Sequence, residues 1–436
     1  MSDIIKSEKE ILAKLGIKAL NDMQVDAREA IGKGPEVLLL SPTGTGKTLA
    51  FLLPVISDLK MDLPEVQALI IAPSRELAMQ IESVAREMGT GLKVNVVYGG
   101  RPIAKDKDEL KTAPAVLVGT PGRIADHFRR GTFSLDAIKY LVLDEFDKSL
   151  EIGFKEQMQE ILDQLSHVKN KVLTSATQGI EIPGFMPWSK PKIVDYSSTG
   201  NRTLTIQQIT SSSKDKLAAL GDALERIGNQ PGIVFCNFIE SIERLSEYLS
   251  DRGIAHGCFY GKMEQTDRER ALIKFRNGTH RLLLATDLAA RGIDVPEIKF
   301  IIHYHLPLKK EEFTHRNGRT ARMNAKGVAY VLHWEQEVLP DFIGNIDEAT
   351  FDHENTKSPT TWSTLFISGG RRDKISKGDI AGLFFKQGQL KRDELGVIEL
   401  KQDCAFVSVP QAKKKQLIRA LDNQRIKKRK VRIREV

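Results

Sequence analysis

The chain reads Ser41-Pro-Thr-Gly-Thr-Gly-Lys-Thr48 directly after a short apolar segment, Glu36–Leu40, and directly before a segment with helical periodicity. A glycine-rich turn between a strand and a helix lets backbone N–H groups close on phosphate oxygens. The lysine of such a loop reaches the β- and γ-phosphates, and the hydroxyl after it binds Mg²⁺. The sequence therefore predicts a nucleotide-phosphate loop formed by Thr43, Gly44, Thr45, Gly46, Lys47 and Thr48, with Thr48 as a metal ligand.

Short β-branched segments alternate with longer amphipathic ones on both sides of this loop. The alternation predicts α/β domains with parallel sheets. It pauses in a Ser/Thr-rich stretch, 196–214, which we expect to be a linker, and again in the polar stretch 347–361. The last part alternates in the order β-α-β-β-α-β, which is ferredoxin-like. We therefore expect two α/β domains, 1–198 and 206–346, and a small RRM-like α+β domain, 362–436.

The net charge of +8 over 436 residues is unevenly distributed. Residues 361–436 hold 19 basic and 8 acidic residues, a balance of +11, which leaves −3 for residues 1–360. A basic terminal domain favours a polyanionic partner. No apolar segment is long enough to span a membrane, and the charged start is not that of a signal peptide. Three widely spaced cysteines exclude a disulfide scaffold or a local zinc motif, so we expect a cytoplasmic protein without a membrane partner.

A second group of candidate residues follows the apolar segment Tyr140–Leu143. The sequence there is Asp144-Glu145-Phe146-Asp147. Acids at the carboxyl end of a buried parallel strand lie beside a phosphate loop in this architecture. We expect Asp144 to hold Mg²⁺ and Glu145 to orient the attacking water. A helix N-cap is the alternative role for such a pair.

The second α/β domain has no phosphate loop of its own, so one nucleotide site must serve both domains. It contains His315-Arg-Asn-Gly-Arg-Thr-Ala-Arg322, whose arginines recur every three residues and are expected on one helical face. Placed opposite a γ-phosphate, such arginines act as fingers that stabilise the transition state. A solvated basic helix face is the alternative.

Residues 20–330 resemble the DEAD-box RNA helicases of superfamily 2, with two RecA-like domains. Motifs of that family occur in family order: Gln24, 41–48, Pro73–Ala78, Gly99-Gly100, Thr120–Arg123, Asp144–Asp147, Ser175-Ala-Thr177, Ala285–Asp294 and His315–Arg322. The resemblance implies that Gln24 reads adenine and that Asp294 contacts the nucleotide, with Arg319 and Arg322 as fingers. It further implies that Arg75, Gly100, Thr120, Arg123 and Thr286 contact the RNA backbone, and that Ser175, Thr177 and Asp147 couple hydrolysis to RNA binding.

Three positions depart from the family pattern. Phe146 replaces the usual alanine, Gln24 lacks the usual proline-bearing approach and upstream aromatic residue, and Ala321 replaces a glycine. A phenyl ring beside the acids needs space, so we expect different local packing there. Phe146 also keeps open an alternative function, an RNA clamp or annealing chaperone that binds ATP but hydrolyses little of it. A DNA helicase is a further alternative.

The terminal domain resembles the RNA-binding domain of the DbpA-type helicases over Thr364–Ile380. Its two expected central strands carry Phe366 and Phe406, which either stack on bases or belong to the core. The alternative RNA-binding surface is basic, Lys413–Lys415 and Lys427–Lys430. We name Phe366, Lys427 and Lys428 as candidate RNA contacts. The resemblance implies a monomeric, ATP- and Mg²⁺-dependent RNA helicase that acts on structured ribosomal RNA in large-subunit assembly.

Overall fold

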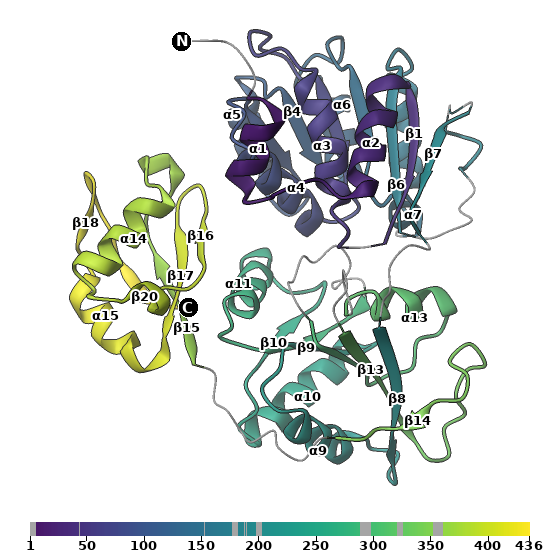
Figure 1. Ribbon diagram of the computed structural model, residues 1–436, viewed down its shortest axis with the longest axis vertical. Helices are drawn as coiled ribbons and strands as arrows, with labels where there is room; N and C mark the ends of the chain where they lie inside the picture. Colours follow the sequence, from purple (N-terminus) through teal and green to yellow (C-terminus); the bar gives the residue numbers. More distant parts are fainter. Residues whose placement is uncertain are drawn as a thin grey trace. The chain divides into compact units, whose positions relative to one another are not determined.

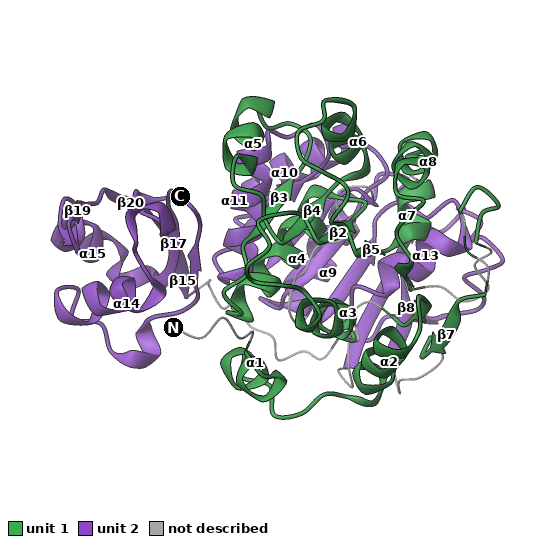
Figure 2. Ribbon diagram, turned by 90° about the horizontal axis from the view of Figure 1, so that it is seen from above, with its two compact units in different colours: residues 1–201, 292–294 green, residues 202–291, 295–436 purple. Residues whose placement is uncertain are grey.

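The computed structural model describes residues 6–42, 44–151, 153–176, 182–186, 188, 190–197, 203–287, 298–320, 326–351 and 361–436. Figure 1 shows the helices and strands along the chain. The chain divides into two compact units, coloured separately in Figure 2. The second unit contains a seven-stranded sheet and a separate four-stranded sheet, which belong to different domains. The expected fold class, two RecA-like domains and a small α+β domain, is confirmed.

The first domain is a seven-stranded parallel sheet in the order β3-β4-β2-β5-β6-β1-β7. Its strands are β1 (Glu36–Leu40), β2 (Ala68–Ile71), β3 (Val94–Val97), β4 (Val116–Gly119), β5 (Tyr140–Leu143), β6 (Asn170–Ser175) and β7 (Lys192–Asp195). Its helices are α1 (Glu8–Leu15), α2 (Asp22–Lys33), α3 (Lys47–Ser57), α4 (Arg75–Glu87), α5 (Ile103–Leu110), α6 (Pro121–Arg129), α7 (Phe146–Glu151) and α8 (Lys155–Gln164).

Alternate residues of each strand face opposite layers of helices, because side chains in a strand alternate between the two faces of the sheet. Val37 and Leu39 pack with α1 to α4, whereas Leu38 and Leu40 pack with α6 to α8. Both faces of the sheet are thus buried, which explains why its strands are apolar at nearly every position.

The second domain repeats this design with the strand order β10-β11-β9-β12-β13-β8-β14, again parallel. Its strands are β8 (Thr203–Ser211), β9 (Gly232–Phe235), β10 (His256–Phe259), β11 (Leu282–Ala285), β12 (Phe300–His303), β13 (Lys326–Trp334) and β14 (Asp347–Glu348). Its described helices are α9 (Leu217–Ile227), α10 (Ile239–Asp251), α11 (Gln265–Arg276) and α13 (Lys310–Asn317).

The expected linker at 196–214 is wrong over most of its length. Residues 203–211 form β8, which pairs with β13 along nine residues. Alternating Thr and Ile residues suit a pleated strand, and pairing with the long β13 outweighs the weak apolar content of this segment.

The third domain is a four-stranded antiparallel sheet in the order β16-β17-β15-β20, with two helices on one face. Its elements are β15 (Trp362–Ile367), η1 (Arg371–Asp373), α14 (Lys377–Lys386), η2 (Arg392–Glu394), β16 (Ile398–Leu400), β17 (Ala405–Pro410), η3 (Gln411–Lys413), α15 (Lys414–Leu421), β18 (Arg425–Ile426), β19 (Arg429–Lys430) and β20 (Ile433–Glu435). The β-α-β-β-α-β order is confirmed. Before the last strand, β19 pairs with β18 as a hairpin, and only β20 joins the sheet.

No helix in the described part of the chain combines the length and the apolar character needed to cross a membrane.

Candidate nucleotide and nucleic-acid site

The expected site residues of the first domain lie at the carboxyl ends of its parallel strands, where ligands of open α/β sheets bind. The phosphate loop follows β1, the acids follow β5, and Ser175 ends β6; these three strands are neighbours in the order β5-β6-β1. The segments expected to contact RNA follow β2, β3 and β4, which are neighbours at the other side of the sheet. The strand order therefore separates the segments expected to bind nucleotide, called here the nucleotide half, from those expected to contact RNA, called here the nucleic-acid half.

The phosphate loop enters α3 through two glycines in the left-handed region, Gly44 at φ +82° and Gly46 at φ +88°. Residues with a Cβ adopt this conformation rarely, so the two glycines permit the tight turn. Lys47 is buried, and its ammonium donates hydrogen bonds to the carbonyls of Ser41 (2.5 Å) and Pro42 (3.1 Å). Thr48 is half-buried in the first turn of α3. Thr43 lies outside the described residues.

Gln24 lies against the phosphate loop from α2. Its amide donates to the carbonyl of Gly46 (3.3 Å), and a Cβ on Gly46 would come within 2.4 Å of that amide nitrogen. Asn21 caps α2 and donates from its amide to the carbonyl of Thr45 (3.1 Å). Gln24 and the loop thus share one surface, which fits the expected reading of a nucleotide base beside its phosphates.

Asp144 and Glu145 form a buried acidic pair beside Lys47. The hydroxyl of Thr174 on β6 donates to the Asp144 carboxylate and accepts from the backbone N–H of Glu145 (3.1 Å). Burial, and then the neighbouring Glu145 carboxylate, raise the pKa of Asp144 to about 6, while Thr174 and Lys47 act in the opposite direction. The position of Thr174 could not be predicted from the sequence, because its role depends on β5 and β6 being neighbours.

Glu145 has two features that are typical of a functional carboxylate. Its φ of +47° is left-handed, which costs a non-glycine residue about 1–3 kcal/mol and recurs at functional sites. Its Oε2 is buried and has no hydrogen-bond partner among the described residues. The backbone geometry is held by the Thr174 hydroxyl, so this acceptor is fixed in position.

The donor set fits Mg²⁺ bound mainly through substrate phosphates and water. No group of three or more His, Cys, Asp or Glu residues in the described ranges could hold a metal alone. Mg²⁺ is normally bound by one or two carboxylates together with phosphate oxygens. Thr48 and Asp144 would supply the protein ligands of such a set, and Glu145 Oε2 is left without a hydrogen-bond partner among the described residues.

Phe146 does not crowd this acidic pair. It is fully buried as the first residue of α7, within the apolar cluster that includes Leu143, Met158 and Ile161. The expected change in local packing is therefore that the ring fills the core behind the acids. The alternative function that Phe146 keeps open, an RNA clamp that hydrolyses little ATP, stays a hypothesis.

The nucleic-acid half is built around Arg75 and Arg123. A Cβ on Gly100, whose φ is +83°, would lie 2.6 Å from a guanidinium nitrogen of Arg75. Arg123 donates to the backbone carbonyls of Tyr98 (3.0 Å) and Arg101. Both arginines thus support the loop after β3, while Thr120 is a buried residue at the start of α6.

A buried carboxylate that the sequence analysis missed organises this loop. Asp106 is fully buried and lies 3.1 Å from Arg101 Nε, 3.2 Å from Arg123 Nε and 3.4 Å from His127 Nε2. Arg123 is therefore engaged in positioning the loop, and its side chain is only 10% exposed. The expected RNA contact of Arg123 stays a prediction.

In the second domain, Arg316 and Arg319 do not share one helical face, because α13 ends at Asn317. Arg316 is 1% exposed and forms a bidentate ion pair with Asp287 (2.7 and 2.5 Å). It also donates to the carbonyl of His305 (2.7 Å) and to Asn237 Oδ1 (2.7 Å). These hydrogen bonds of Arg316 connect the ends of β9, β11 and β12 to α13. Sequence spacing alone could not reveal this network.

The remaining candidate site residues of the second domain lie near the hydrogen-bond network of Arg316 in the chain or outside the described residues. Thr286 precedes Asp287, and its backbone N–H donates to the carbonyl of Phe259 (3.4 Å). Arg319 lies in the turn after α13 and is buried. Asp294, Arg322 and the departure at Ala321 lie outside the described residues.

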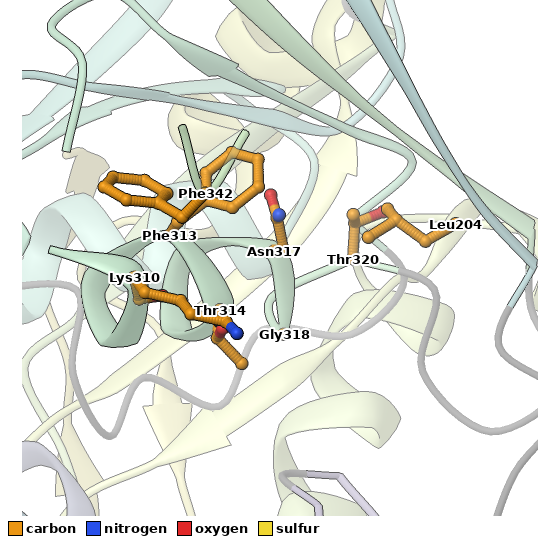
Figure 3. A pocket seen from close by; sticks show the side chains of 8 residues that line it. All are labelled: Leu204, Lys310, Phe313, Thr314, Asn317, Gly318, Thr320 and Phe342. Atoms are coloured by element: carbon orange, nitrogen blue, oxygen red, sulfur yellow. The ribbon is translucent and has the colours of Figure 1, made fainter. Parts of the chain in front are cut away.

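A pocket of about 300 Å³ lies beside that turn, as Figure 3 shows. The rings of Phe313 and Phe342, 6.0 Å apart, form its apolar side, and Lys310 and Asn317 contribute polar groups. Gly318 and Thr320 line it on either side of Arg319 in the chain. The pocket is built from second-domain residues.

The three expected coupling residues are only partly described. Ser175 and Asp147 are both buried, at the end of β6 and in the first turn of α7. Asp147 lies 3.9 Å from the ammonium of Lys148. Thr177 lies outside the described residues, and the expected bond to Asp147 stays a prediction.

The candidates of the third domain separate onto two surfaces. Phe366 and Phe406 lie together on the sheet face away from α14 and α15, outside the apolar core cluster. Phe406 is buried and Phe366 is half-buried, so base stacking and a core role both stay predictions. Lys427 and Lys428 lie exposed in the turn of the β18–β19 hairpin.

Three segments of the chain match known families. Residues 21–182 match the DEAD/DEAH box helicase family, 215–324 the helicase conserved C-terminal domain, and 364–435 the DbpA RNA binding domain. The chain is 31% identical over 458 residues to the ATP-dependent RNA helicase DbpA of Bacillus subtilis (strain 168), covering 97% of this chain and 96% of the relative. It is also 31% identical, over 444 residues and the same shares, to DbpA of Escherichia coli (strain K12). A similar solved structure is S. cerevisiae Dbp5 bound to RNA and ADP BeF3, with a TM-score of 0.68, 25% identity, and coverage of 80% of this chain and 93% of that one.

Proposed function

This chain belongs to the DEAD-box family of ATP-dependent RNA helicases, and from that premise we propose that it separates short duplexes in structured ribosomal RNA during large-subunit assembly. The protein is an RNA-stimulated ATPase with a DbpA-type RNA-binding domain. In this proposal it acts in the cytoplasm as a monomer, with ATP and Mg²⁺, and its third domain selects the RNA.

The observation that carries the catalytic part is the group formed by Lys47, Asp144, Glu145 and Thr174. Lys47 binds the β- and γ-phosphates of ATP, and Thr48 and Asp144 hold the metal. Bound Mg²⁺ supplies positive charge that offsets the developing charge on the phosphates. The Glu145 carboxylate accepts a hydrogen bond from the attacking water. Its buried Oε2, which has no hydrogen-bond partner among the described residues, supports this role. Gln24 reads the adenine edge.

RNA binding along the nucleic-acid half explains the stimulation. Arg75, Gly100, Thr120 and Arg123 of the first domain and Thr286 of the second grip the backbone, a mode that carries no base information. RNA and ATP together favour closure of the second domain on the nucleotide, which brings Arg319, Arg322 and Asp294 to the phosphates. Ser175, Thr177 and Asp147 couple the two halves, a role supported by β5, which precedes Asp147 and is the neighbour of β2 in the nucleic-acid half.

The charge distribution supports an anchoring role for the third domain. The motor, residues 1–360, carries −3 and the remainder +11, so the long-range attraction to RNA belongs to the terminal domain. An anchor on structured RNA leaves the motor free to act on adjacent duplexes with little sequence preference.

The test compares steady-state ATPase of the full chain with that of residues 1–360, using single-stranded RNA and fragments of large-subunit ribosomal RNA. We expect one fragment to activate the full chain at a concentration at least tenfold lower than single-stranded RNA does, and to lose this advantage with the truncated chain. Equal activation of the full chain by all RNAs would contradict the ribosomal target. Failure of both chains to respond to any RNA would contradict the coupling itself.

A further inference from the structure

An exposed aromatic ring lies at the carboxyl end of a central strand of the second domain. Phe238 is 59% exposed, lies three residues after the end of β9 and is the N-cap residue of α10. In the sheet, β9 lies between β11 and β12. Ligands of open parallel sheets bind outside the carboxyl ends of the strands. The ring is therefore at the edge of this domain where a ligand is expected.

The neighbouring strand ends at an expected RNA contact. Ala285, the last residue of β11, is the register partner of Phe235, the last residue of β9, and its carbonyl accepts from the backbone N–H of Cys236 (2.9 Å). Thr286 therefore follows β11 at the level where Cys236 follows β9. The ring of Phe238 and the expected backbone contact at Thr286 thus belong to adjacent strand ends.

The backbone that carries the ring is fixed by the residue before it. The backbone N–H of Asn237 donates to His305 Nδ1 (3.1 Å), and its side-chain amide donates to the carbonyl of Leu306 (3.1 Å). Its Oδ1 accepts from the buried guanidinium of Arg316 (2.7 Å). A side chain held on such a fixed backbone loses less freedom when it binds a ligand.

The imidazole of His305 contacts the phenyl ring of Phe238 at a ring-to-ring distance of 5.5 Å and an interplanar angle of 74°. His305 lies in the same way against Tyr304, at 5.0 Å and 73°. Its Nδ1 accepts from Asn237, so the hydrogen of the neutral imidazole is on Nε2. Burial, and then Lys216, lower the pKa of His305 to about 4, so the imidazole is uncharged at neutral pH. The phenyl ring thus has an uncharged aromatic support and keeps most of its own surface open.

Phenylalanine is an unfavourable residue at this position. Phe238 forms no side-chain hydrogen bond to the first turn of α10. Ser, Thr, Asp and Asn are preferred at an N-cap, because their side-chain oxygen accepts from a backbone N–H of that turn. The rest of the helix follows the usual pattern, with Ile242, Leu245 and Leu249 buried on one face. A local departure in an otherwise regular element is expected where the residue serves a function.

An unpaired nucleobase matches this ring in shape and chemistry. Bases of single-stranded RNA stack on aromatic side chains, and the contact tolerates any sequence because every base has a flat face. The loop that begins at His305 continues into Lys309 and Lys310, which are exposed and suit the phosphates of the same strand. Protein interfaces are depleted of lysine. The surroundings of the ring therefore favour RNA over a protein partner.

We propose that Phe238 stacks on an unpaired base of the RNA strand whose backbone contacts Thr286. The inference rests on the proposed function and adds to it a base-binding subsite in the motor, besides the backbone contacts. A base that stacks on a side chain has left the stack of its duplex. The ring would therefore favour the separated strand over the duplex.

The experiment measures the dissociation constant of the full chain for three single-stranded oligomers of equal length, with a nonhydrolysable ATP analogue present. The oligomers are oligoadenylate, oligouridylate and a ribose-phosphate chain without bases. We expect Phe238→Thr to weaken binding of oligoadenylate about fivefold or more, because one base stack on an aromatic side chain has this order of effect. Binding of the chain without bases should change by less than about twofold.

The same variant distinguishes a binding role from a structural one. Threonine can cap α10, so the urea midpoint of Phe238→Thr should equal or exceed that of the unsubstituted chain while RNA affinity falls. Phe238→Tyr keeps the ring and should retain RNA affinity within about twofold. Ile193→Thr is the matched control, because Ile193 is an equally exposed apolar residue (59%) on β7 of the first domain. It should leave RNA affinity unchanged.

Three outcomes would overturn the inference. An equal loss of affinity for oligoadenylate and for the chain without bases would show that the ring does not act through a base. Unchanged affinity of Phe238→Thr for all three oligomers would remove the subsite. A lower urea midpoint together with weaker binding would show that the ring is structural. Absence of RNA-stimulated ATPase in the unsubstituted chain would instead contradict the proposed function, so the two failures are read from different measurements.

Discussion

Replacement of Arg316 by methionine should destabilise the second domain while leaving the phosphate loop of the first domain intact. The guanidinium is 1% exposed and donates four hydrogen bonds, two to Asp287, one to Asn237 and one to the carbonyl of His305. Removal of one partner of a buried ion pair costs about 3–5 kcal/mol, and the loss here should lie at the lower end of this range because Asp287 is 25% exposed. With a urea dependence of about 2 kcal/mol per molar, the unfolding midpoint of this domain should fall by about 2 M.

The matched control is Arg244→Met in the same domain. Arg244 pairs with Asp215 at 2.6 Å, but the two side chains are 60% and 46% exposed, so the loss should stay below about 1 kcal/mol. Urea unfolding of the full chain, followed by tryptophan fluorescence, measures both variants.

The Arg316→Met variant should also affect activity, because Arg316 pairs with Asp287, which adjoins Thr286. We expect RNA-stimulated hydrolysis to fall, while ATP binding measured with a fluorescent nucleotide changes little. The reasoning is refuted if Arg316→Met is no more destabilising than Arg244→Met.

Three further predictions concern other parts of the chain. Phe146→Ala should restore the usual family residue yet destabilise the first domain by about 3–5 kcal/mol, because the ring is fully buried; an unchanged melting temperature would contradict this packing. Burial, and then Arg316, lower the pKa of His303 to about 3, so below pH 6.5 the unfolded chain takes up a proton that the folded domain does not. Stability is therefore complete above pH 6.5 and falls by about 2 kcal/mol towards pH 5, and His303→Gln should remove this part of the acid sensitivity in urea titrations at both pH values. Salt should weaken RNA binding of the full chain more steeply than that of residues 1–360, and parallel slopes in a filter-binding titration would show that the basic domain does not contact phosphates.

Local sequence patterns were sufficient for the phosphate loop and for most strands. Glu36–Leu40 was expected and observed with identical bounds, because a continuous apolar segment before a glycine-rich turn fits a buried parallel strand. The polar residues of segment 203–211 predict a linker, whereas the segment is a strand that is stabilised by pairing with β13, more than a hundred residues later.

The side-chain networks depended on tertiary contacts that no spacing rule contains. Arg316 was grouped with Arg319 and Arg322 by periodicity, but α13 ends at Asn317 and Arg316 pairs with Asp287 instead. Phe146 was read from its neighbours in the chain as a ring beside the acids, whereas the turn into α7 directs it into the core. The ion pair of Arg316 and the packing of Phe146 both depend on residues that are distant in the sequence but adjacent in the folded domain.

The most direct test of the coupling between RNA and ATP is the steady-state ATPase rate of the full chain, with and without saturating RNA, beside Lys47→Ala. The account predicts a rate that rises at least tenfold with RNA, and no turnover above background in Lys47→Ala under either condition. An RNA-independent rate in a protein that demonstrably binds RNA, or normal turnover in Lys47→Ala, would contradict it.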